Sequence, residues 1–249
     1  MNVIFASYGN DSIALIQWAI EHSLPYVTVA YSDTGWAAPY WEERVARAEL
    51  WANAAGFATA RIRSDGMLAI IRRKKGWPRN GMQFCTQLLK IEPASIWLDQ
   101  FDPRREATCL VGVRREESAA RAAWPMWTEE SVNHGGRSLW APLVNATASE
   151  RDALVGRAGF DVLPHRSMEC FPCVNSSRAD LRLLDEDRIA HIERIESDMG
   201  MTANGKPRTM FRPNKFMGAV GIREVARWAR AERGRYEPAR GCDSGMCGD

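Results

Sequence analysis

The sequence predicts an α/β protein with a Rossmann-like, mostly parallel sheet covered by helices on both faces and a smaller C-terminal region of helices and loops. Short apolar and β-branched runs alternate with segments of helical spacing through the first part of the chain. The chain has 249 residues, of which 45% are hydrophobic and 26% charged, enough for one sizeable domain with an appendage.

In the first half of the chain strands and helices alternate. The apolar run from Val3 to Ala6 predicts a strand over 2–6, and Ile13, Ile16 and Ile20 lie on one face of a predicted helix. The predicted elements continue in order with a helix over 12–22, a strand over 26–32, a helix over 39–55, a strand over 57–62, a helix over 87–100, a buried strand over 107–113 and a helix over 117–124.

From about residue 138 the alternation weakens. Segment 139–143 is short and extended, segment 148–158 is helical, and prolines make 161–177 a loop. Helices are expected within 178–200 and 220–233. We therefore expect a core over 1–145, a helical region over 146–239 and a mobile, cysteine-containing tail over 240–249.

The charge is nearly balanced. The 33 basic and 31 acidic residues leave a net charge of +2, which is no global nucleic-acid signature. The segment 70–79 is locally basic, and we interpret it as a solvated loop, with a phosphate-tracking patch as the alternative. No apolar run approaches the about 20 residues of a membrane helix and no secretory signal begins the chain, so we expect a cytoplasmic protein without membrane association.

A small polar loop, Ser7-Tyr8-Gly9-Asn10-Asp11-Ser12, separates the first strand from the first helix. Unpaired backbone N–H groups and the helix dipole make such a loop an anion site. Ser7 and Ser12 add hydroxyls, Gly9 permits close approach, and Asp11 can cap the helix or help to hold Mg²⁺. The alternative is a tight loop without a ligand.

Three further segments carry polar residues just after or near predicted strands. They are Asp33-Thr34-Gly35, the stretch F-C-T-Q-L-L-K-I-E-P over 84–93, and V-G-V-R-R-E-E-S-A-A-R over 111–121. The first can also be an Asx-type turn and the last a surface helix start. Arginine pairs after a buried strand favour phosphate or sulfate binding.

In this order, over about residues 3–175, the four segments resemble the PP-loop pyrophosphatases and the phosphoadenosine phosphosulfate (PAPS) reductase family. The first loop is similar to S-G-G-x-D-S with Tyr8 in place of a glycine, and the third segment to C-C-x-x-x-K-x-x-P with Thr86 in place of the second cysteine. The fourth is similar to G-x-R-R-x-x-S-x-x-R.

The resemblance implies that the core over 1–145 binds an adenine nucleotide, ATP or APS/PAPS, with Mg²⁺. It implies the nucleotide-binding residues Ser7, Tyr8, Gly9, Asp11, Ser12, Asp33, Thr34, Gly35, Lys90, Gly112 and Arg121. It also implies catalytic roles for Asp11, Arg114, Arg115 and a tail cysteine, Cys247.

The Cys170-x-x-Cys173 pair and Cys85 resemble the ligands of a 4Fe-4S cluster in adenylylsulfate reductases. Because Thr86 replaces the fourth ligand, one iron would be open, as in cluster-dependent sulfurtransferases, including the DNA phosphorothioation enzymes that the chain also resembles. The alternatives are a structural zinc site completed by His165, and a thiol pair without metal.

The remaining cysteines divide into two kinds. Cys109 lies within a predicted strand and is expected to be a buried core thiol. Cys242 and Cys247 lie in the tail, where Cys247-Gly248 shares two residues with the E-C-G-L-H segment of the reductases. Cys247 could be a nucleophile or carry a persulfide, either cysteine could supply the fourth cluster ligand, and the alternative is no role.

Three functions follow from the resemblance. The first is a sulfurtransferase that adenylates an acceptor with ATP, releases pyrophosphate and takes sulfur from a donor such as a cysteine desulfurase; a nucleic acid is one candidate acceptor. The second is reduction of APS or PAPS to sulfite by a thiol or thioredoxin-like reductant. The third is a non-catalytic nucleotide-binding subunit with a structural metal.

Overall fold

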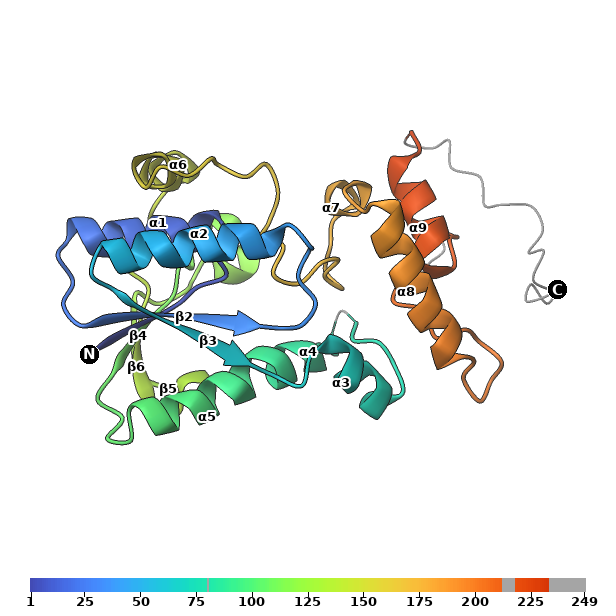
Figure 1. Cartoon of the computed structure of the whole chain (residues 1–249), viewed down its shortest axis with the longest axis horizontal. Helices are drawn as coiled ribbons and strands as arrows, with labels where there is room; N and C mark the ends of the chain where they lie inside the picture. The colour runs from blue at the N-terminus through green and yellow to red at the C-terminus, as the bar shows by residue number, and fades with distance from the viewer. Residues whose placement is uncertain (80, 212–217, 233–249) are drawn as a thin grey trace. The chain divides into compact units, whose positions relative to one another are not determined.

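The computed structural model describes residues 1–79, 81–211 and 218–232 (Figure 1). Contacts divide the chain into two compact units, which we describe separately. Unit 1 comprises Met1–Ile70 and Phe84–Phe171, and unit 2 comprises Ile71–Gln83 and Pro172–Asp249. The domain boundaries expected at residues 145 and 239 stay a prediction.

Unit 1 contains a six-stranded sheet in the order β3-β2-β1-β4-β6-β5. The strands are β1 (Asn2–Phe5), β2 (Val27–Asp33), β3 (Ala58–Arg63), β4 (Thr108–Leu110), β5 (Trp127–Ser131) and β6 (Arg137–Trp140). All neighbouring strands are parallel except β5, which pairs antiparallel with β6. The predicted α/β fold with a mostly parallel sheet is confirmed.

Helices cover both faces of this sheet. Figure 1 shows α1, α2 and α6 on one face and α5 on the other. The helices of unit 1 are α1 (Asn10–Glu21), α2 (Trp41–Ala54), α4 (Phe84–Thr86), the π-helix η1 (Gln87–Ile91), α5 (Glu92–Phe101), the 3₁₀ helices η2 (Arg115–Glu117), η3 (Ala119–Arg121) and η4 (Val132–His134), and α6 (Ala148–Arg157). Buried Val3, Cys109 and Leu98 belong to the core between the sheet and α5.

Unit 2 is built from α7 (Arg178–Arg182), α8 (Glu186–Met199) and α9 (Gly221–Arg230). Buried isoleucines of α8 and the apolar side of α9 form its interior. Glu196 of α8 accepts the backbone N–H groups of Met210 at 2.8 Å and Ile222 at 2.9 Å, and thereby ties α8 to the first turn of α9. No helix within the described ranges is long and apolar enough to cross a membrane.

Three elements differ from the sequence-based expectation. The basic segment begins inside a helix, α3 (Met67–Lys74), because Met67, Ile70 and Ile71 form a buried helical face. Strand β5 was not expected, since W-T-E-E-S is polar and mostly exposed. The helix expected over 117–124 is replaced by the short helices η2 and η3.

Candidate functional site

The first loop lies at the point where the strand order reverses, between β1 and β4. Ligands of open α/β sheets bind at the carboxyl ends of the strands beside such a switch point. The loops after the two strands touch: a Cβ on Gly112 would lie 2.8 Å from the backbone oxygen of Asp11. Glycine at 112 therefore allows the fourth segment to pack against the first loop.

The two serines of the first loop contact each other. The backbone N–H of Ser7 donates to Ser12 Oγ at 3.0 Å, and the two hydroxyl oxygens are 3.1 Å apart. Gly9 is the N-cap of α1, and a Cβ there would lie 2.9 Å from Ser167 Cβ. The loop is thus compact, with its hydroxyls beside the first turn of α1.

Helix α2 holds the other side of this loop. Trp41 Nε1 donates to the backbone oxygen of Ser7 at 3.2 Å, and Arg44 Nε donates to that of Tyr8 at 2.7 Å. In a trans peptide the N–H points opposite to the C=O. The N–H groups of Tyr8 and Gly9 therefore point away from α2, and the N–H of Gly9 makes a long hydrogen bond of 3.4 Å to Ser7 Oγ.

Tyr8 itself adopts the left-handed conformation, with φ +57°. Its ring is fully buried and packs against Tyr31 with 5.6 Å between centroids. Its hydroxyl has no hydrogen-bond partner among the described residues, and burial raises its pKa. We expect any contact of Tyr8 with a nucleotide to come from its backbone.

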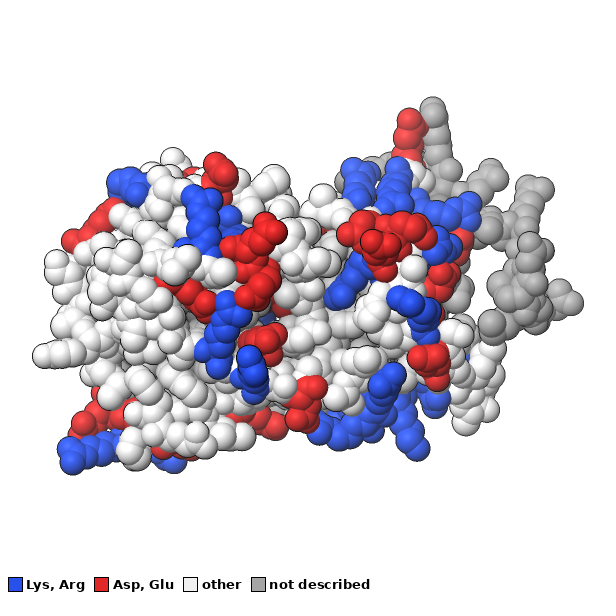
Figure 2. All heavy atoms as spheres, viewed as in Figure 1, with Lys and Arg blue, Asp and Glu red and all other residues white. Residues whose placement is uncertain are grey.

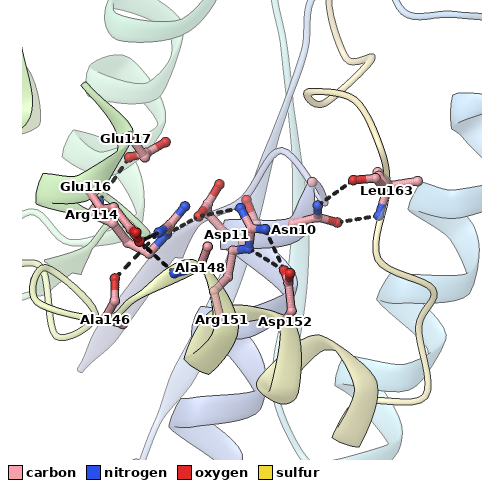
Figure 3. Close-up of polar contacts among 12 residues, drawn as sticks. Asn10, Asp11, Arg114, Glu116, Glu117, Ala146, Ala148, Arg151, Asp152 and Leu163 are labelled. Atoms are coloured by element: carbon pink, nitrogen blue, oxygen red, sulfur yellow. Dashed lines mark hydrogen bonds and ion pairs between the residues drawn. The ribbon is translucent and has the colours of Figure 1, made fainter.

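An ion pair joins the first loop to the fourth segment (Figure 3). Arg114 Nε lies 2.7 Å from Asp11 Oδ1, and Arg114 Nη1 lies 3.2 Å from Glu116 Oε2. Arg114 is only 4% exposed. Glu116 also accepts the N–H of Ala148 at 2.6 Å, at the start of α6. Arg151 Nη1 approaches Asp11 Oδ1 at 3.9 Å.

The other two arginines of the fourth segment bond elsewhere. Arg115 donates to the backbone oxygen of Trp124 at 3.0 Å and to Asn145 Oδ1 at 2.7 Å. Arg121 pairs with Glu117. Of the three arginines, Arg114 contacts the first loop, whereas the side-chain bonds of Arg115 and Arg121 are made to other residues.

The Asp33-Thr34-Gly35 segment forms an Asx-type turn in which Asp33 Oδ1 accepts the N–H of Gly35 at 3.0 Å. Gly35 has φ +61°, which favours glycine. The buried Thr34 hydroxyl donates to the backbone oxygen of Glu169 at 2.6 Å. Further backbone bonds join residues 36–38 to 168–171, with Trp36 pairing with Cys170. This turn therefore anchors the start of the Cys-x-x-Cys segment.

A cavity of about 280 Å³ opens at the carboxyl ends of β1 and β2. Its polar wall includes the hydroxyls of Ser7, Ser12 and Ser32 and the ion pair between Lys90 and Glu169. Lys90 lies on the π-helical turn η1, and such turns often occur at functional sites. Phe5, Ala6, Ala30, Ile91 and Ala94 line the apolar side.

Asn133 and His134 also line this cavity, and sequence reasoning missed both. His134 Nδ1 lies 2.8 Å from Ser131 Oγ, and the imidazole packs against Phe5. Burial, and then the nearby Arg137, lower the pKa of His134 to about 4. The imidazole is therefore neutral at pH 7. Only its place on the turn V-N-H-G-G could have drawn attention to it.

The three cysteines expected to bind a cluster are divided between the two units. Cys85 and Cys170 belong to unit 1 and Cys173 to unit 2. All three are free of disulfides, so their chemistry suits iron or zinc. Within the described ranges, however, no three His, Cys, Asp or Glu residues are grouped so that they could hold a metal.

The other sulfur predictions have separate outcomes. Cys109 is fully buried, and burial raises its pKa to about 12, so the expected core thiol is confirmed. His165, the alternative zinc ligand, is half-buried, with Nδ1 2.8 Å from the backbone oxygen of Arg166. Cys242 and Cys247 lie outside the described residues.

Two kinds of comparison relate this chain to known proteins, one of sequence and one of structure. An uncharacterized 37.8 kDa protein in the gpa 5′ region of Escherichia phage 186 is 27% identical over 233 residues, covering 73% of this chain and 69% of that protein. Among solved structures, PAPS reductase from Candida auris in a phosphate complex aligns with TM-score 0.46 and 16% identity, over 64% of this chain and 73% of that one.

The U34-tRNA thiolase NcsA from Methanococcus maripaludis, solved with its [4Fe-4S] cluster, aligns with TM-score 0.49 and 12% identity, over 80% of this chain and 67% of that one. The sequence model of the phosphoadenosine phosphosulfate reductase domain matches residues 1–180. That match spans all four segments and the Cys-x-x-Cys loop, and the chain therefore belongs to the phosphoadenosine phosphosulfate reductase domain family.

Proposed function

We propose that this protein binds ATP, adenylates an acceptor and transfers sulfur to it. One observation carries the nucleotide part. The loop at the switch point turns two N–H groups away from α2, while the hydroxyls of Ser7 and Ser12 line the adjoining cavity. That arrangement suits phosphates beside the first turn of α1, with the base in the apolar part of the cavity.

In the proposed first step, an oxygen of the acceptor attacks the α-phosphate of ATP. A bond forms between that oxygen and phosphorus, the bond to the β-phosphate oxygen breaks, and pyrophosphate leaves with the electron pair. The N–H groups of Tyr8 and Gly9 and the serine hydroxyls stabilise the charge that develops. Arg114 is held beside this loop by Asp11, so its positive charge adds to the same field.

Magnesium is part of the proposal, and Asp11 is its candidate ligand. A carboxylate oxygen suits Mg²⁺, which also binds substrate phosphates and keeps several waters. The ion pair with Arg114 uses Oδ1 of Asp11. Asp11 therefore has two proposed roles, as metal ligand and as the group that positions Arg114.

The sulfur part rests on the cysteines, for which we propose Cys85, Cys170 and Cys173 as ligands of a 4Fe-4S cluster. A cluster with an open iron would hold sulfide for transfer. Because the described residues do not gather three such donors, we route no step through it. Iron and acid-labile sulfide per chain, measured on protein purified without oxygen, test the ligand set. About four irons that are lost in Cys170→Ser support it, whereas about one zinc contradicts it.

The second candidate is reduction of PAPS or APS to sulfite, which the name of the family domain favours. In that reaction a thiolate attacks the sulfur of the sulfonucleotide and the nucleotide leaves. A second thiol then releases sulfite and leaves a disulfide for an external reductant to reduce. Cys247 is the proposed nucleophile, so Cys247→Ser abolishes this reaction and leaves pyrophosphate release intact.

A nucleic acid is the acceptor that the surface charge supports. The end of α3 and the turn after it carry exposed Arg72, Arg73, Lys74 and Lys75. Figure 2 shows Lys and Arg side chains gathered over α3 on the visible face, whereas over α8 and α9 they are interleaved with Asp and Glu. Such groups bind phosphodiesters without sequence preference. Binding of an oligonucleotide that weakens steeply with salt, and weakens further when Lys74 and Lys75 become Gln, tests this surface.

The deciding experiment measures pyrophosphate from ATP and sulfite from PAPS in parallel, with and without a nucleic-acid acceptor. Pyrophosphate release that is lost in Ser12→Ala and kept in the exposed matched control Ser149→Ala supports the adenylation. Sulfite release without pyrophosphate supports the reductase. ATP binding with neither product would leave a nucleotide-binding subunit and overturn both reactions.

A further inference from the structure

A second cavity, of about 420 Å³, adjoins the cavity of about 280 Å³ described above, which we call the nucleotide cavity. The two cavities share Asn133 and His134 as lining residues. The second cavity lies between the loop that follows β4 and the β5-β6 hairpin, and its volume falls within the ~300–1,000 Å³ of small-molecule sites. Nothing proposed above uses it.

The walls of this cavity favour a neutral, flat ring. Val111, Val113 and Leu139 form apolar walls, and the half-buried indole of Trp124 packs against the core. Among the described residues that line it, none is Lys or Arg. A phosphate therefore finds no counter-charge there, whereas an indole beside an apolar wall is a stacking surface for a base.

Trp124 is held in place from its backbone. Its carbonyl accepts from Arg115 at 3.0 Å, and its N–H donates to the backbone oxygen of Arg121 at 2.9 Å. The arginine-rich loop thus fixes the backbone of Trp124, from which the indole extends. This gives Arg115 a specific task although its side chain does not reach the first loop.

The polar rim can recognise the edge of a base. Glu130 and Thr128 come from β5, where the pairing with β6 shifts between Thr128 and Ser131. Irregularities of this kind often re-aim side chains next to active sites. The Glu130 carboxylate accepts hydrogen bonds, and the Asn133 amide both donates and accepts them. Val132, also on the wall, is 92% exposed, so a bound ring would cover an apolar surface.

We propose that this second cavity binds the base of a nucleotide acceptor beside the adenine nucleotide, with Trp124 stacking on the ring and Glu130 accepting from its exocyclic amino group. The assignment rests on the proposed function, because it supplies the acceptor of the adenylation. Asn133 and His134 line both cavities, so the acceptor base would lie next to the nucleotide.

The test keeps the first cavity filled. Calorimetry first measures binding of a non-hydrolysable ATP analogue in the nucleotide cavity. If the analogue does not bind, that result counts against the proposed function, and the second cavity is then tested without it. Ligand-observed NMR then measures cytidine and uridine with the analogue at saturation. We expect cytidine to bind several-fold more tightly than uridine, because only cytosine carries the amino group.

Matched variants locate the site. Trp124→Ala should weaken cytidine at least about tenfold, Trp124→Phe should retain most binding, and Glu130→Gln should remove the preference for cytidine. Trp127→Ala is the control, since Trp127 lies on the same strand as Glu130 but does not line the cavity. Circular dichroism checks that each variant is folded.

Three outcomes overturn the assignment: no nucleoside binding, binding that is unchanged in Trp124→Ala, and competition between cytidine and the ATP analogue. Competition would mean that the cavity belongs to the nucleotide's own base. A short oligocytidine distinguishes the source of the base. If the oligocytidine binds more tightly than cytidine and its binding weakens with salt, the acceptor base belongs to a nucleic-acid chain. If the two bind equally, the acceptor is a free nucleotide.

Discussion

The pairing of Asp11 with Arg114 joins two segments that lie far apart in the sequence. Arg114 is nearly fully buried, whereas the side chain of Asp11 is 31% exposed. A buried arginine that loses its carboxylate costs more than the pair contributes, because the charge is left without compensation. The aspartate therefore matters for stability as well as for the proposed chemistry.

Asp11→Asn is predicted to lower the free energy of unfolding by about 2–3 kcal/mol, because it removes the shorter of the two carboxylate contacts of the buried Arg114 and leaves only Glu116 at 3.2 Å. Urea unfolding measures the change. Asp152→Asn, which breaks a partly exposed pair with Arg151, should cost at most about 1 kcal/mol, because the Asp152 side chain is 38% exposed. Equal effects of the two substitutions would contradict the assignment.

Asp11→Ala is further predicted to abolish pyrophosphate release from ATP, since it removes both the proposed magnesium ligand and the partner of Arg114. The assay is run at a temperature where urea unfolding shows the variant to be folded. Turnover like that of the unchanged protein would refute a role for Asp11 in binding magnesium and ATP.

At the scale of elements, a buried arginine fixes the turn that carries Asn133 and His134. Arg137 of β6 is fully buried, with Nε 2.7 Å from Asp102 Oδ2 and Nη2 bonded to the backbone oxygens of Leu98 and Asp102. Nη1 donates to the backbone oxygen of His134 at 3.2 Å. Burial opposes ionisation of Asp102, but Arg137 and two backbone N–H groups outweigh it and lower its pKa.

Asp102→Asn is predicted to cost about 3–5 kcal/mol of stability, because it removes the buried carboxylate that contacts Arg137 and leaves that guanidinium only the exposed carboxylate of Asp99. The matched control is Asp99→Asn: Asp99 contacts the same guanidinium at 3.2 Å, but its side chain is 48% exposed. That change should cost at most about 1 kcal/mol. Chemical denaturation measures both, and a small loss in Asp102→Asn would contradict the anchoring role of Arg137.

At the scale of the whole molecule, the two units respond to pH in opposite directions. In unit 1 burial lowers the pKa of His134 to about 4. At a pH below the ordinary pKa of histidine, the unfolded state therefore binds a proton that the folded state does not. In unit 2 burial raises the pKa of Glu196 to about 7. At a pH between the ordinary pKa of glutamate and 7, the folded state therefore binds a proton that the unfolded state does not.

Acidification from about pH 7.5 to 5.5 is therefore predicted to destabilise unit 1 and to stabilise unit 2 through Glu196, whose large shift outweighs the opposing effect of the lowered pKa of His191 on the same helix. Scanning calorimetry should show two transitions that move in opposite directions. His134→Gln should remove the shift of the unit 1 transition, and Glu196→Gln that of the unit 2 transition. Transitions that move together in the unchanged protein would refute the assignment of these two groups.

By itself, the sequence determined the order and type of most elements and the four polar segments, because hydrophobic spacing and loop chemistry are local properties. It also indicated that Cys109 is a core thiol. Strand β5 was not predicted, because a short exposed edge strand has no strong apolar pattern. Helix α3 was not predicted, because the basic residues at its end led us to interpret the segment as a solvated loop.

Only the tertiary structure decided which polar residues meet. The pairing of Asp11 with Arg114, the anchoring of residues 168–171 by the Thr34 turn, and the two cavities that share Asn133 and His134 all join segments distant in sequence. The spacing of residues along the chain carries no signal for such contacts, because they depend on strand order and on burial, which the sheet creates when it assembles.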